Sequence, residues 1–247
     1  FYFLSKHNEK VIYECHQLSK IKKILIKSSV KETDSKIIFV NPHMVKDLGL
    51  SEGSKVKVLP SAFDEEVFSN SNATLKTNRI IYAGSINRFG KSRGLDSLIT
   101  GLSKLNNSEF QFVIASNDDL STELMSLINS KELNIEYHQN LSRTALSELY
   151  NSCTVGLLVN NKSEHAERFT SPLKYFEYIA SGLKVVASDS KSHRLLPYQE
   201  SIDYFDSSSI SSFIDAVNKA INSKQPTYNE IQLHTMNHRV SNILNFY

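Results

Sequence analysis

Residues 79–99 read RIIYAGSINRFGKSRGLDSLI, and this stretch decides the fold. Its β-branched and aromatic start, Arg79–Ala83, predicts a strand. Three of the chain's 8 glycines follow between Gly84 and Gly94. Leucine and isoleucine then recur at helical spacing from Leu95 onward. The stretch therefore predicts a strand, a glycine-rich loop and a helix in direct succession.

The same alternation extends in both directions from this stretch. Later strand-like runs occupy residues 109–115, 134–138, 155–159 and 185–187, with apolar residues at helical spacing between and after them. Earlier, residues 10–15, 36–40 and 55–59 also read as strands, and a polar stretch from 60 to about 68 follows them. This pattern predicts an α/β fold with a parallel, doubly wound sheet, whose ligands bind beyond the carboxyl ends of the strands.

Composition narrows the class of protein. Hydrophobic residues make up 40% and charged residues 22% of the 247, as in ordinary globular domains. A formal net charge of +2 argues against nucleic acid as a partner. Cys15 and Cys153 lie in apolar surroundings far apart in sequence, so we expect no disulfide framework and a reducing, cytoplasmic compartment. No apolar run reaches the length that spans a bilayer.

The glycine-rich loop is suited to an anion. Glycines let the backbone approach a ligand closely, and the free amides and dipole of the next helix favour negative charge. Arg88, Lys91 and Arg93 add three cations in six residues, which favours a diphosphate over a carboxylate. The alternative is a solvated basic loop that only caps a helix.

A second anion site is predicted at a helix start further along the chain. Ser171 suits the N-cap and Pro172 the first helical position. The amides of Leu173 and Lys174 then lack an intrahelical partner, and Lys174 adds a charge. Glu177 lies one turn on and can accept hydrogen bonds from ribose hydroxyls. We expect the two helix N-termini to converge on one diphosphate.

Residues 171–188, SPLKYFEYIASGLKVVAS, resemble the donor-site signature of the retaining group 1 glycosyltransferases, relatives of bacterial mannosyltransferases and glycogen synthases. Residues 55–68 resemble the family's interdomain stretch, and residues 79–99 resemble its first C-terminal strand, phosphate loop and helix. The resemblance implies a GT-B type fold: a Rossmann-like parallel sheet in the C-terminal domain, with a partial second Rossmann-like domain before it.

The resemblance also implies domain limits. Residues 1–65 would be the partial, acceptor-side N-terminal domain, residues 66–227 the nucleotide-sugar-binding domain, and residues 228–247 a helix that packs back on the N-terminal domain. The family's N-terminal domain is normally about as large as its C-terminal one, so we expect part of the acceptor side to be missing here.

Several residues acquire roles through the resemblance. Arg88 and Arg93 would grip the donor diphosphate, with Lys91 sharing that role, in a donor loop that begins with Gly84 and Ser85. The start of the later helix would present its backbone amides to the phosphates through Ser171, Pro172, Leu173 and Lys174. Apart from the resemblance, we expect the backbone near residues 138–141 to recognise the base, because this loop follows a strand that faces the cleft.

Two further positions bear on the sugar and the acceptor. Glu177 matches the second glutamate of the family's E-x7-E motif, which holds the ribose, but Phe169 stands where the first glutamate is expected. Glu164 and Glu167 are the candidate substitutes. His16, after the strand at residues 10–15, matches the family's active-site histidine, which contacts the sugar or orients the acceptor. The alternative is a strand-end histidine without a role.

The implied reaction is transfer of a hexosyl or related group from a UDP-, GDP- or ADP-sugar to a glycan or lipid-linked acceptor, with retention of configuration. Arg88, Arg93 and Lys174 would stabilise the departing diphosphate, so no metal and no cofactor are expected. Residues 20–27, KIKKILIK, predict either peripheral contact with anionic lipid at the inner face of a membrane or an ordinary amphipathic helix.

Three other functions stay open from the sequence. The first is a non-catalytic module that binds nucleotide sugars. The second is a P-loop NTPase using the GKS of residues 90–92, although Ser85 stands where that motif needs glycine. The third is a sugar-nucleotide epimerase, for which no acidic catalytic pair is evident. His234 and His238 have the spacing of a zinc motif but lack its glutamate, so a solvated helix face is expected there.

Overall fold

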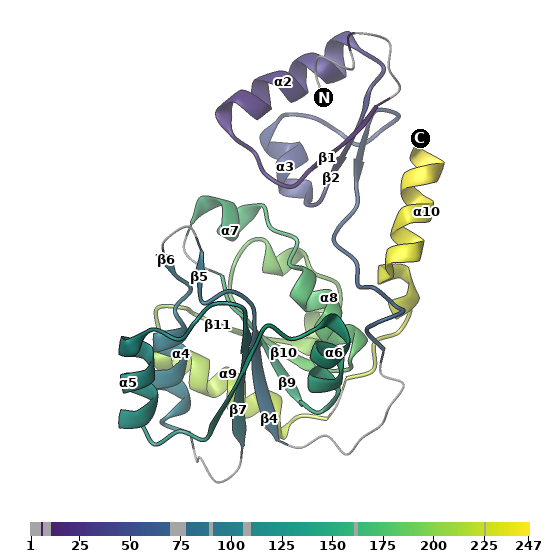
Figure 1. Cartoon of the computed structure of the whole chain (residues 1–247). Coiled ribbons are helices and arrows are strands. Elements are labelled where there is room, and N and C mark those ends of the chain that lie inside the picture. Colours follow the sequence, from purple (N-terminus) through teal and green to yellow (C-terminus); the bar gives the residue numbers. More distant parts are fainter. Residues whose placement is uncertain are drawn as a thin grey trace.

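A computed structural model describes residue 6 and residues 11–69, 78–88, 91–105, 110–160, 163–224 and 226–247, apart from the side chains of residues 88, 91 and 92. The described chain forms a smaller part around one parallel sheet and a larger part around another (Figure 1). The last helix starts beside the larger part and runs back along the smaller one, as the yellow ribbon in Figure 1 shows.

The larger sheet has six parallel strands within the described residues, in the order β11-β10-β9-β4-β7-β8. The chain runs outward from β4 through β7 to β8, and then returns to the other side of β4 with β9. The order therefore switches direction between β4 and β9. The strands are β4 (Arg79–Ala83), β7 (Gln111–Ser116), β8 (Ile135–Gln139), β9 (Val155–Leu158), β10 (Lys184–Ser188) and β11 (Ile202–Phe205).

Helices cover both faces of this sheet, and the two-residue alternation of β4 assigns the faces. Ile80 and Tyr82 pack in the core cluster that contains the apolar residues of α4 and α9. Ile81 and Ala83 pack in the opposite cluster, with α6 and α8. Burial on both faces explains the continuous apolar sequence of these strands. The helices are α4 (Leu95–Leu102), α5 (Thr122–Ser130), α6 (Arg143–Asn151), α7 (Glu164–Arg168), α8 (Leu173–Ala180) and α9 (Ile210–Asn222).

The smaller part has a three-stranded parallel sheet in the order β1-β2-β3. Helix α2 begins after Ser19, whose hydroxyl accepts a hydrogen bond from the Lys22 amide at 3.2 Å. Asn41 caps α3 in the same way, and Pro42 follows it at the first helical position. The elements are β1 (Ile12–Cys15), α2 (Lys20–Glu32), β2 (Lys36–Phe39), α3 (Pro42–Asp47) and β3 (Val56–Val58).

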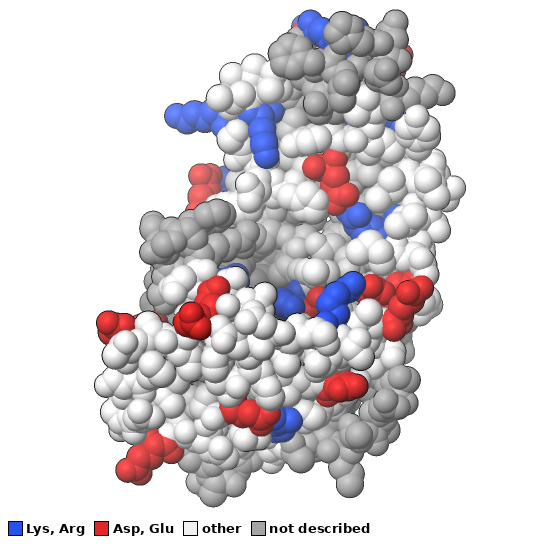
Figure 2. Space-filling model, viewed as in Figure 1, with Lys and Arg blue, Asp and Glu red and all other residues white. Residues whose placement is uncertain are grey.

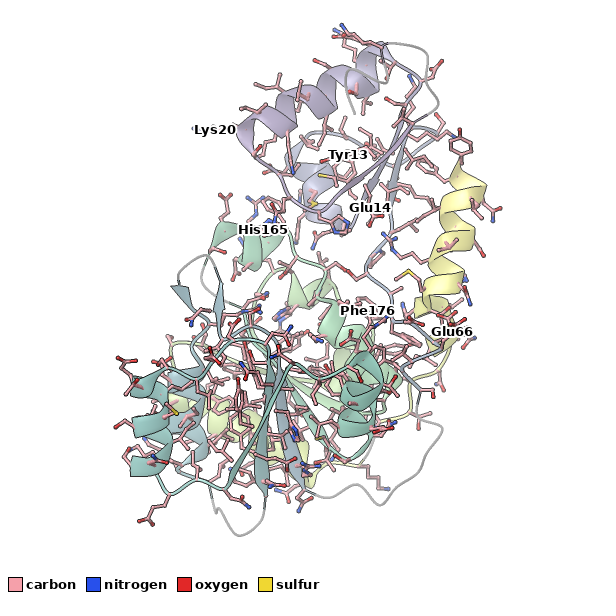
Figure 3. The ribbon with its side chains drawn as sticks, viewed as in Figure 1. Tyr13, Glu14, Lys20, Glu66, His165 and Phe176 are labelled. Atoms are coloured by element: carbon pink, nitrogen blue, oxygen red, sulfur yellow. The ribbon has the colours of Figure 1, made fainter. Side chains whose placement is uncertain are left out.

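The C-terminal helix α10 (Met236–Phe246) contacts the smaller part along its length. Arg239 forms an ion pair with Glu14 at 2.5 Å, at the end of β1, where Figure 3 labels Glu14. Lys36 donates a hydrogen bond to the carbonyl of Phe246 and lies 5.0 Å from the centre of its ring. Arg239 also donates to the carbonyl of Pro60 at 2.8 Å, so α10 holds both β1 and the connection between the two parts.

Most predicted elements are present, with boundaries shifted by one or two residues. Strand β11 was not predicted, because IDYF at residues 202–205 has no periodicity of its own. The last helix was predicted to include Leu233, which is wrong. Thr235 caps a new helix by accepting from the His238 amide at 3.2 Å, and residues Ile231–His234 form a separate 3-10 turn.

No helix among the residues described is long and apolar enough to cross a membrane.

Gly156 in β9 sets how closely α8 approaches the sheet. A Cβ atom at this position would lie 2.6 Å from Cδ2 of the Tyr178 ring, which is closer than packed atoms come. We expect Gly156→Ala to lower the free energy of unfolding by about 1–3 kcal/mol, because α8 must move away from β9. Urea unfolding measures the change.

Gly53→Ala is the matched control for that substitution. A Cβ added at Gly53 meets nothing within 4 Å, so its unfolding free energy should stay close to that of the wild type. Equal stability of the two variants would show that Tyr178 does not pack tightly against β9.

Candidate functional site

The candidate site is a hollow of about 270 Å³ between the two parts of the molecule. Its floor is the switch point of the larger sheet. Ala83 ends β4 there, and residues 157–160 cover the end of β9 and the two residues after it. Figure 2 shows the molecule hollowed between the two parts, with Lys and Arg atoms at the edge of the larger one. We call this space the interdomain hollow. A ligand here would lie beyond the carboxyl ends of parallel strands, as expected for this class of sheet.

The smaller part contributes the upper wall. His16 and Gln17, which follow β1, line the interdomain hollow together with Val40 after β2. The imidazole of His16 lies 2.9 Å from a Glu14 carboxylate oxygen, and 63% of its side chain is exposed. Since Glu14 is itself held by Arg239, the C-terminal helix fixes the carboxylate that orients His16.

Arg93 lies on the lower wall of the interdomain hollow, beside the Tyr82 hydroxyl. It donates to the Val159 carbonyl at 3.3 Å, and its Nε is buried without a hydrogen-bond partner. Within the described part of the chain, no carboxylate forms an ion pair with it. A Cβ atom on Gly84 would lie 3.7 Å from its Nη1, and Gly84 has φ +147°, which residues with side chains rarely adopt. Arg93 is therefore available to an anion beside a glycine.

The donor loop is anchored by a residue that the sequence did not single out. Asp118, in the turn after β7, accepts hydrogen bonds from the amides of Ile86 at 2.7 Å and Asn87 at 3.0 Å. Ser116 in turn accepts from the Asp118 amide at 3.0 Å. The repeated carboxylates of residues 118–119 after a predicted strand were the available signal. Asp118 holds the loop so that Arg93 reaches the hollow.

Arg88 and Lys91 form part of a short hairpin of β5 (Asn87–Arg88) and β6 (Lys91–Ser92). Their side chains lie outside the described residues, so their contact with a phosphate stays a prediction. The hairpin excludes the P-loop alternative, which needs its lysine and serine to open a helix. Here they form a strand, and α4 begins only at Leu95, after Gly94.

The start of α8 lies on the lower wall, but its predicted cap is wrong. Helix α8 begins at Leu173, with Pro172 at the N-cap position and no side-chain cap. The Ser171 hydroxyl instead accepts from the Ser61 amide at 2.8 Å, and the Ser61 hydroxyl donates to the Ser171 carbonyl at 2.7 Å. Ser171 does not cap α8 because its hydroxyl and carbonyl bind Ser61, in the segment that connects the two parts. The first amides of α8, at Leu173 and Lys174, still lack an intrahelical acceptor.

The predicted convergence of two helix starts is met only in part. Residues 171–174 line the interdomain hollow together with Arg93. Gly94, at the start of α4, lines an adjacent hollow of about 180 Å³ with Phe205 and Ile210 instead. Arg93 and Asn160 line both spaces. The anion-binding groups of the interdomain hollow are therefore Arg93, Lys174 and the first turn of α8.

Another hollow, of about 230 Å³, adjoins the interdomain hollow on the side of β4, and we call it the second hollow. Gly84, Ser85 and Ser116 line it, with Leu141 from the loop after β8. Ala83 and Lys174 line both this second hollow and the interdomain hollow. One extended ligand could therefore pass Lys174 and occupy both spaces.

Glu177 is buried beneath Lys174 and not open to the solvent. Its side chain is 5% exposed and accepts from Lys174 Nζ at 2.9 Å and from the Tyr150 hydroxyl at 3.2 Å. Burial, and then the charges of Tyr178 and Glu177, raise the pKa of Tyr150, so this hydroxyl stays a donor. Glu177 is absent from the described walls of both hollows. Its contact with a ribose stays a prediction.

Phe169 does not take the place of a sugar-binding carboxylate. It is 4% exposed and packs in the core cluster of the smaller part, with the Arg168 guanidinium 4.8 Å from the centre of its ring. Of the two substitutes, Glu164 pairs with Arg168 at 3.1 Å on α7, and Glu167 accepts from the Lys191 amide at 3.2 Å. Neither glutamate lines the described walls of the interdomain hollow. His165 on α7, labelled in Figure 3, does line it.

His193 is buried directly beneath the interdomain hollow. Its Nδ1 lies 2.7 Å from the Ser188 carbonyl, and its Nε2 lies 2.9 Å from the side-chain amide of Asn160. Burial lowers the pKa of His193 to about 4, and the nearby Arg93 charge acts in the same direction. The imidazole is therefore neutral near pH 7.

This burial makes stability depend on pH. Because the folded-state pKa lies below the unfolded value near 6.5, the unfolded chain binds more protons between the two values. The stability that His193 contributes by staying neutral is fully present above pH 6.5 and is lost as the pH falls through about 4. This loss lowers the free energy of unfolding by up to about 3 kcal/mol.

Chemical unfolding at a series of pH values measures this slope. In His193→Gln residue 193 cannot titrate, so this variant should lose less stability between pH 6.5 and 4 than the wild type does. His16→Gln removes an exposed histidine and should show the same pH dependence as the wild type. A His193→Gln variant with the full wild-type slope would assign the effect to other groups.

The sequence model of the family described as "Glycosyl transferases group 1" matches residues 77–223, which is more than half of the chain. No curated protein sequence matches the chain significantly.

Solved structures share the fold. A sucrose-phosphate synthase from Thermosynechococcus elongatus superposes with a TM-score of 0.70 and 13% identity, over 96% of this chain and 66% of that one. A glycosyltransferase from Rickettsia africae gives 0.69 and 14%, over 100% and 69%. WaaG, a glycosyltransferase involved in lipopolysaccharide biosynthesis, gives 0.62 and 13%, over 90% and 71%. The chain thus spans about two thirds of the length of these structures, and its fold is of the GT-B type. With its family match over the larger sheet, the chain belongs to the group 1 glycosyltransferases.

Proposed function

We propose that this chain binds a nucleoside diphosphate sugar and transfers its hexosyl or related group to a glycan or lipid-linked acceptor, with retention of configuration. One observation carries the proposal: His16 on one wall of the interdomain hollow faces a wall made by Arg93, Lys174 and the start of α8. A donor phosphate and an acceptor can therefore be held in the same space. Family membership supports the reaction class.

The cations of the lower wall differ in availability. Departure of a nucleoside diphosphate builds negative charge on its phosphate oxygens, and fixed donors stabilise that charge. Lys174 is already paired with Glu177, whereas Arg93 forms no ion pair with a described residue. We therefore assign the main share of phosphate binding to Arg93 and the amides of α8. With these groups in place, the proposed transfer needs no metal ion and no cofactor.

In this proposal the nucleoside occupies the second hollow. It shares Ala83 and Lys174 with the interdomain hollow, so a diphosphate near Lys174 could have its nucleoside on one side and its sugar on the other. Leu141, from the loop where base recognition was expected, lines the nucleoside side. His16 then lies on the sugar side, where it contacts the sugar or orients the acceptor.

Titration calorimetry with UDP, GDP and ADP, with and without EDTA, tests the donor site. We expect one of the three to bind equally well in EDTA. Arg93→Met should weaken it about tenfold or more, because hydrogen bonds to a charged group contribute about 1.5–3 kcal/mol. Arg143→Met is the matched control: this arginine pairs with Asp64 on the surface and lies outside the described hollows.

The calorimetry, together with an incubation of the chain with the matching sugar nucleotide, distinguishes three cases. Binding that requires Mg²⁺, or that ignores Arg93→Met, would contradict the proposed site. Release of the nucleoside diphosphate from the matching sugar nucleotide, followed by chromatography, would support an enzyme. Tight binding of the sugar nucleotide without any release would favour a non-catalytic binding module.

Helix α2 supports a peripheral membrane contact for a lipid-linked acceptor. Ile21 and Ile24 are 70% and 66% exposed, although the helix also buries Ile26 against the small sheet. Lysines at positions 20, 22, 27 and 31 are exposed along it, and its first turn carries no acidic residue. Figure 3 labels Lys20 where α2 begins. Exposed isoleucine beside lysine suits the surface of an anionic bilayer.

Sedimentation with vesicles of phosphatidylcholine, with and without phosphatidylglycerol, measures this contact. We expect binding only to the anionic vesicles, and less binding at high salt. The double substitution Ile21→Ser and Ile24→Ser should weaken it about tenfold or more, because it removes the apolar area that inserts. Leu244→Ser, at a residue 67% exposed on α10, is the matched control. Binding unchanged by the double substitution would rule out α2 as the contact.

A further inference from the structure

Asn160 lines the interdomain hollow, which is the sugar side of the proposed donor site. It lies two residues after Leu158, the last residue of β9. Its neighbour Val159 accepts a hydrogen bond from Arg93, and Arg93 and Asn160 both line the interdomain hollow. The backbone N–H of Asn160 donates a hydrogen bond to the Ser188 hydroxyl at 3.2 Å. The backbone at this position is therefore well defined.

The orientation of the Asn160 side chain follows from the tautomer of His193. The Ser188 carbonyl can only accept, so Nδ1 of His193 must carry the proton. Nε2 of the neutral ring is then an acceptor, and its partner is Asn160 Nδ2 at 2.9 Å. The Ala166 carbonyl accepts from the same Nδ2 at 3.0 Å, which fixes the nitrogen and oxygen ends of the amide. Both N–H groups of Asn160 are thus used within the protein.

The oxygen end of the amide is left for a ligand. Among the residues that the structure describes, none donates a hydrogen bond to Oδ1 of Asn160. Asn160 is half-buried and lines the interdomain hollow, so a ligand in that hollow can reach its side chain. An amide oxygen only accepts. It therefore suits a neutral donor such as a hydroxyl, and it disfavours a phosphate oxygen, which Arg93 attracts.

We propose that Asn160 is a specificity-determining residue that accepts a hydrogen bond from a hydroxyl of the donor sugar, with His193 as the positioning residue that fixes its amide. The inference rests on the proposed function, because it requires the diphosphate to bind at Arg93. It also supplies a sugar-binding acceptor at a place in the chain other than Phe169, which packs in the core of the smaller part.

The network behind Asn160 keeps this arrangement constant. Thr170 donates to the Ala166 carbonyl at 3.1 Å, and the Ser192 hydroxyl donates to the same carbonyl at 2.9 Å. His193 is fully buried, and its low pKa keeps Nε2 an acceptor throughout the neutral range. A rotated Asn160 amide would place its oxygen against both the Ala166 carbonyl and Nε2. The protein therefore holds one orientation before the ligand arrives.

The experiment compares two affinities for each variant, by calorimetry. The first is that of UDP, GDP or ADP, whichever binds, and the second is that of its glucose, galactose and mannose conjugates. Asn160→Ala should leave the affinity for the diphosphate unchanged and weaken the preferred conjugate about three- to tenfold, the effect of one hydrogen bond. Conjugates in which one hydroxyl of the sugar is replaced by fluorine identify the hydroxyl that Asn160 binds. The conjugate that lacks this hydroxyl should bind the wild type more weakly than the unmodified conjugate does. Asn160→Ala should bind these two conjugates equally well.

Two further variants separate positioning from stability. His193→Phe fills the same space without an acceptor, so it should reduce the preference for the conjugate while the diphosphate binds as before. Ser190→Ala removes a buried hydroxyl that contacts Ser192 and the His193 amide, outside the described walls of the hollow. It should lower stability and keep the preference.

The outcomes are distinct. If no diphosphate binds the wild type, the proposed donor site fails and this inference fails with it. If the diphosphate binds through Arg93 but Asn160→Ala binds the diphosphate and its conjugates as the wild type does, only the role of Asn160 is refuted. Should His193→Phe weaken the diphosphate and the conjugate alike, His193 is structural and not a positioning residue.

Discussion

The hydroxyl of Tyr178 is the interaction on which the site depends. It accepts from the Ala83 amide at 3.1 Å and donates to the Leu157 carbonyl at 3.4 Å, and so joins β4 and β9 where their ladder ends. The ring packs on Gly156, which lets α8 lie close to the sheet. One side chain thus satisfies backbone groups at the switch point and fixes the helix whose first turn faces the ligand. Burial raises the pKa of Tyr178, which keeps the hydroxyl neutral.

The two parts of the molecule are joined by contacts that come from the site itself. Asn41 of the smaller part donates to the Thr170 carbonyl at 2.9 Å, and Ser61 exchanges two hydrogen bonds with Ser171. Phe169 adds an apolar contact between these polar ones. The segment before α8 therefore has two functions in the structure: it lines the interdomain hollow and holds the smaller part above it. This double use explains why Ser171 does not cap α8.

The charges of the site are arranged so that one cation stays available. Lys174 is neutralised by Glu177, and Glu177 is held in turn by Tyr150. Arg93 instead contacts the Val159 carbonyl and the Tyr82 hydroxyl and pairs with no described carboxylate, and Asp118 holds its loop through backbone amides. A half-buried guanidinium such as that of Arg93 interacts more strongly with an anion than a fully solvated one does. The unpartnered Nε of Arg93 is consistent with a site that awaits a negative ligand.

The sequence by itself determined the alternation of most strands and helices, the glycine-rich loop and, to within one residue, the start of α8, because apolar period and glycine or proline position act over a few residues. It also identified the family through residues 171–188. Only the tertiary structure decided that Ser171 leaves its helix, that Phe169 enters the other core, and that His193 fixes Asn160. Each of these depends on a partner many residues away, and contacts of that kind leave no local pattern in a sequence.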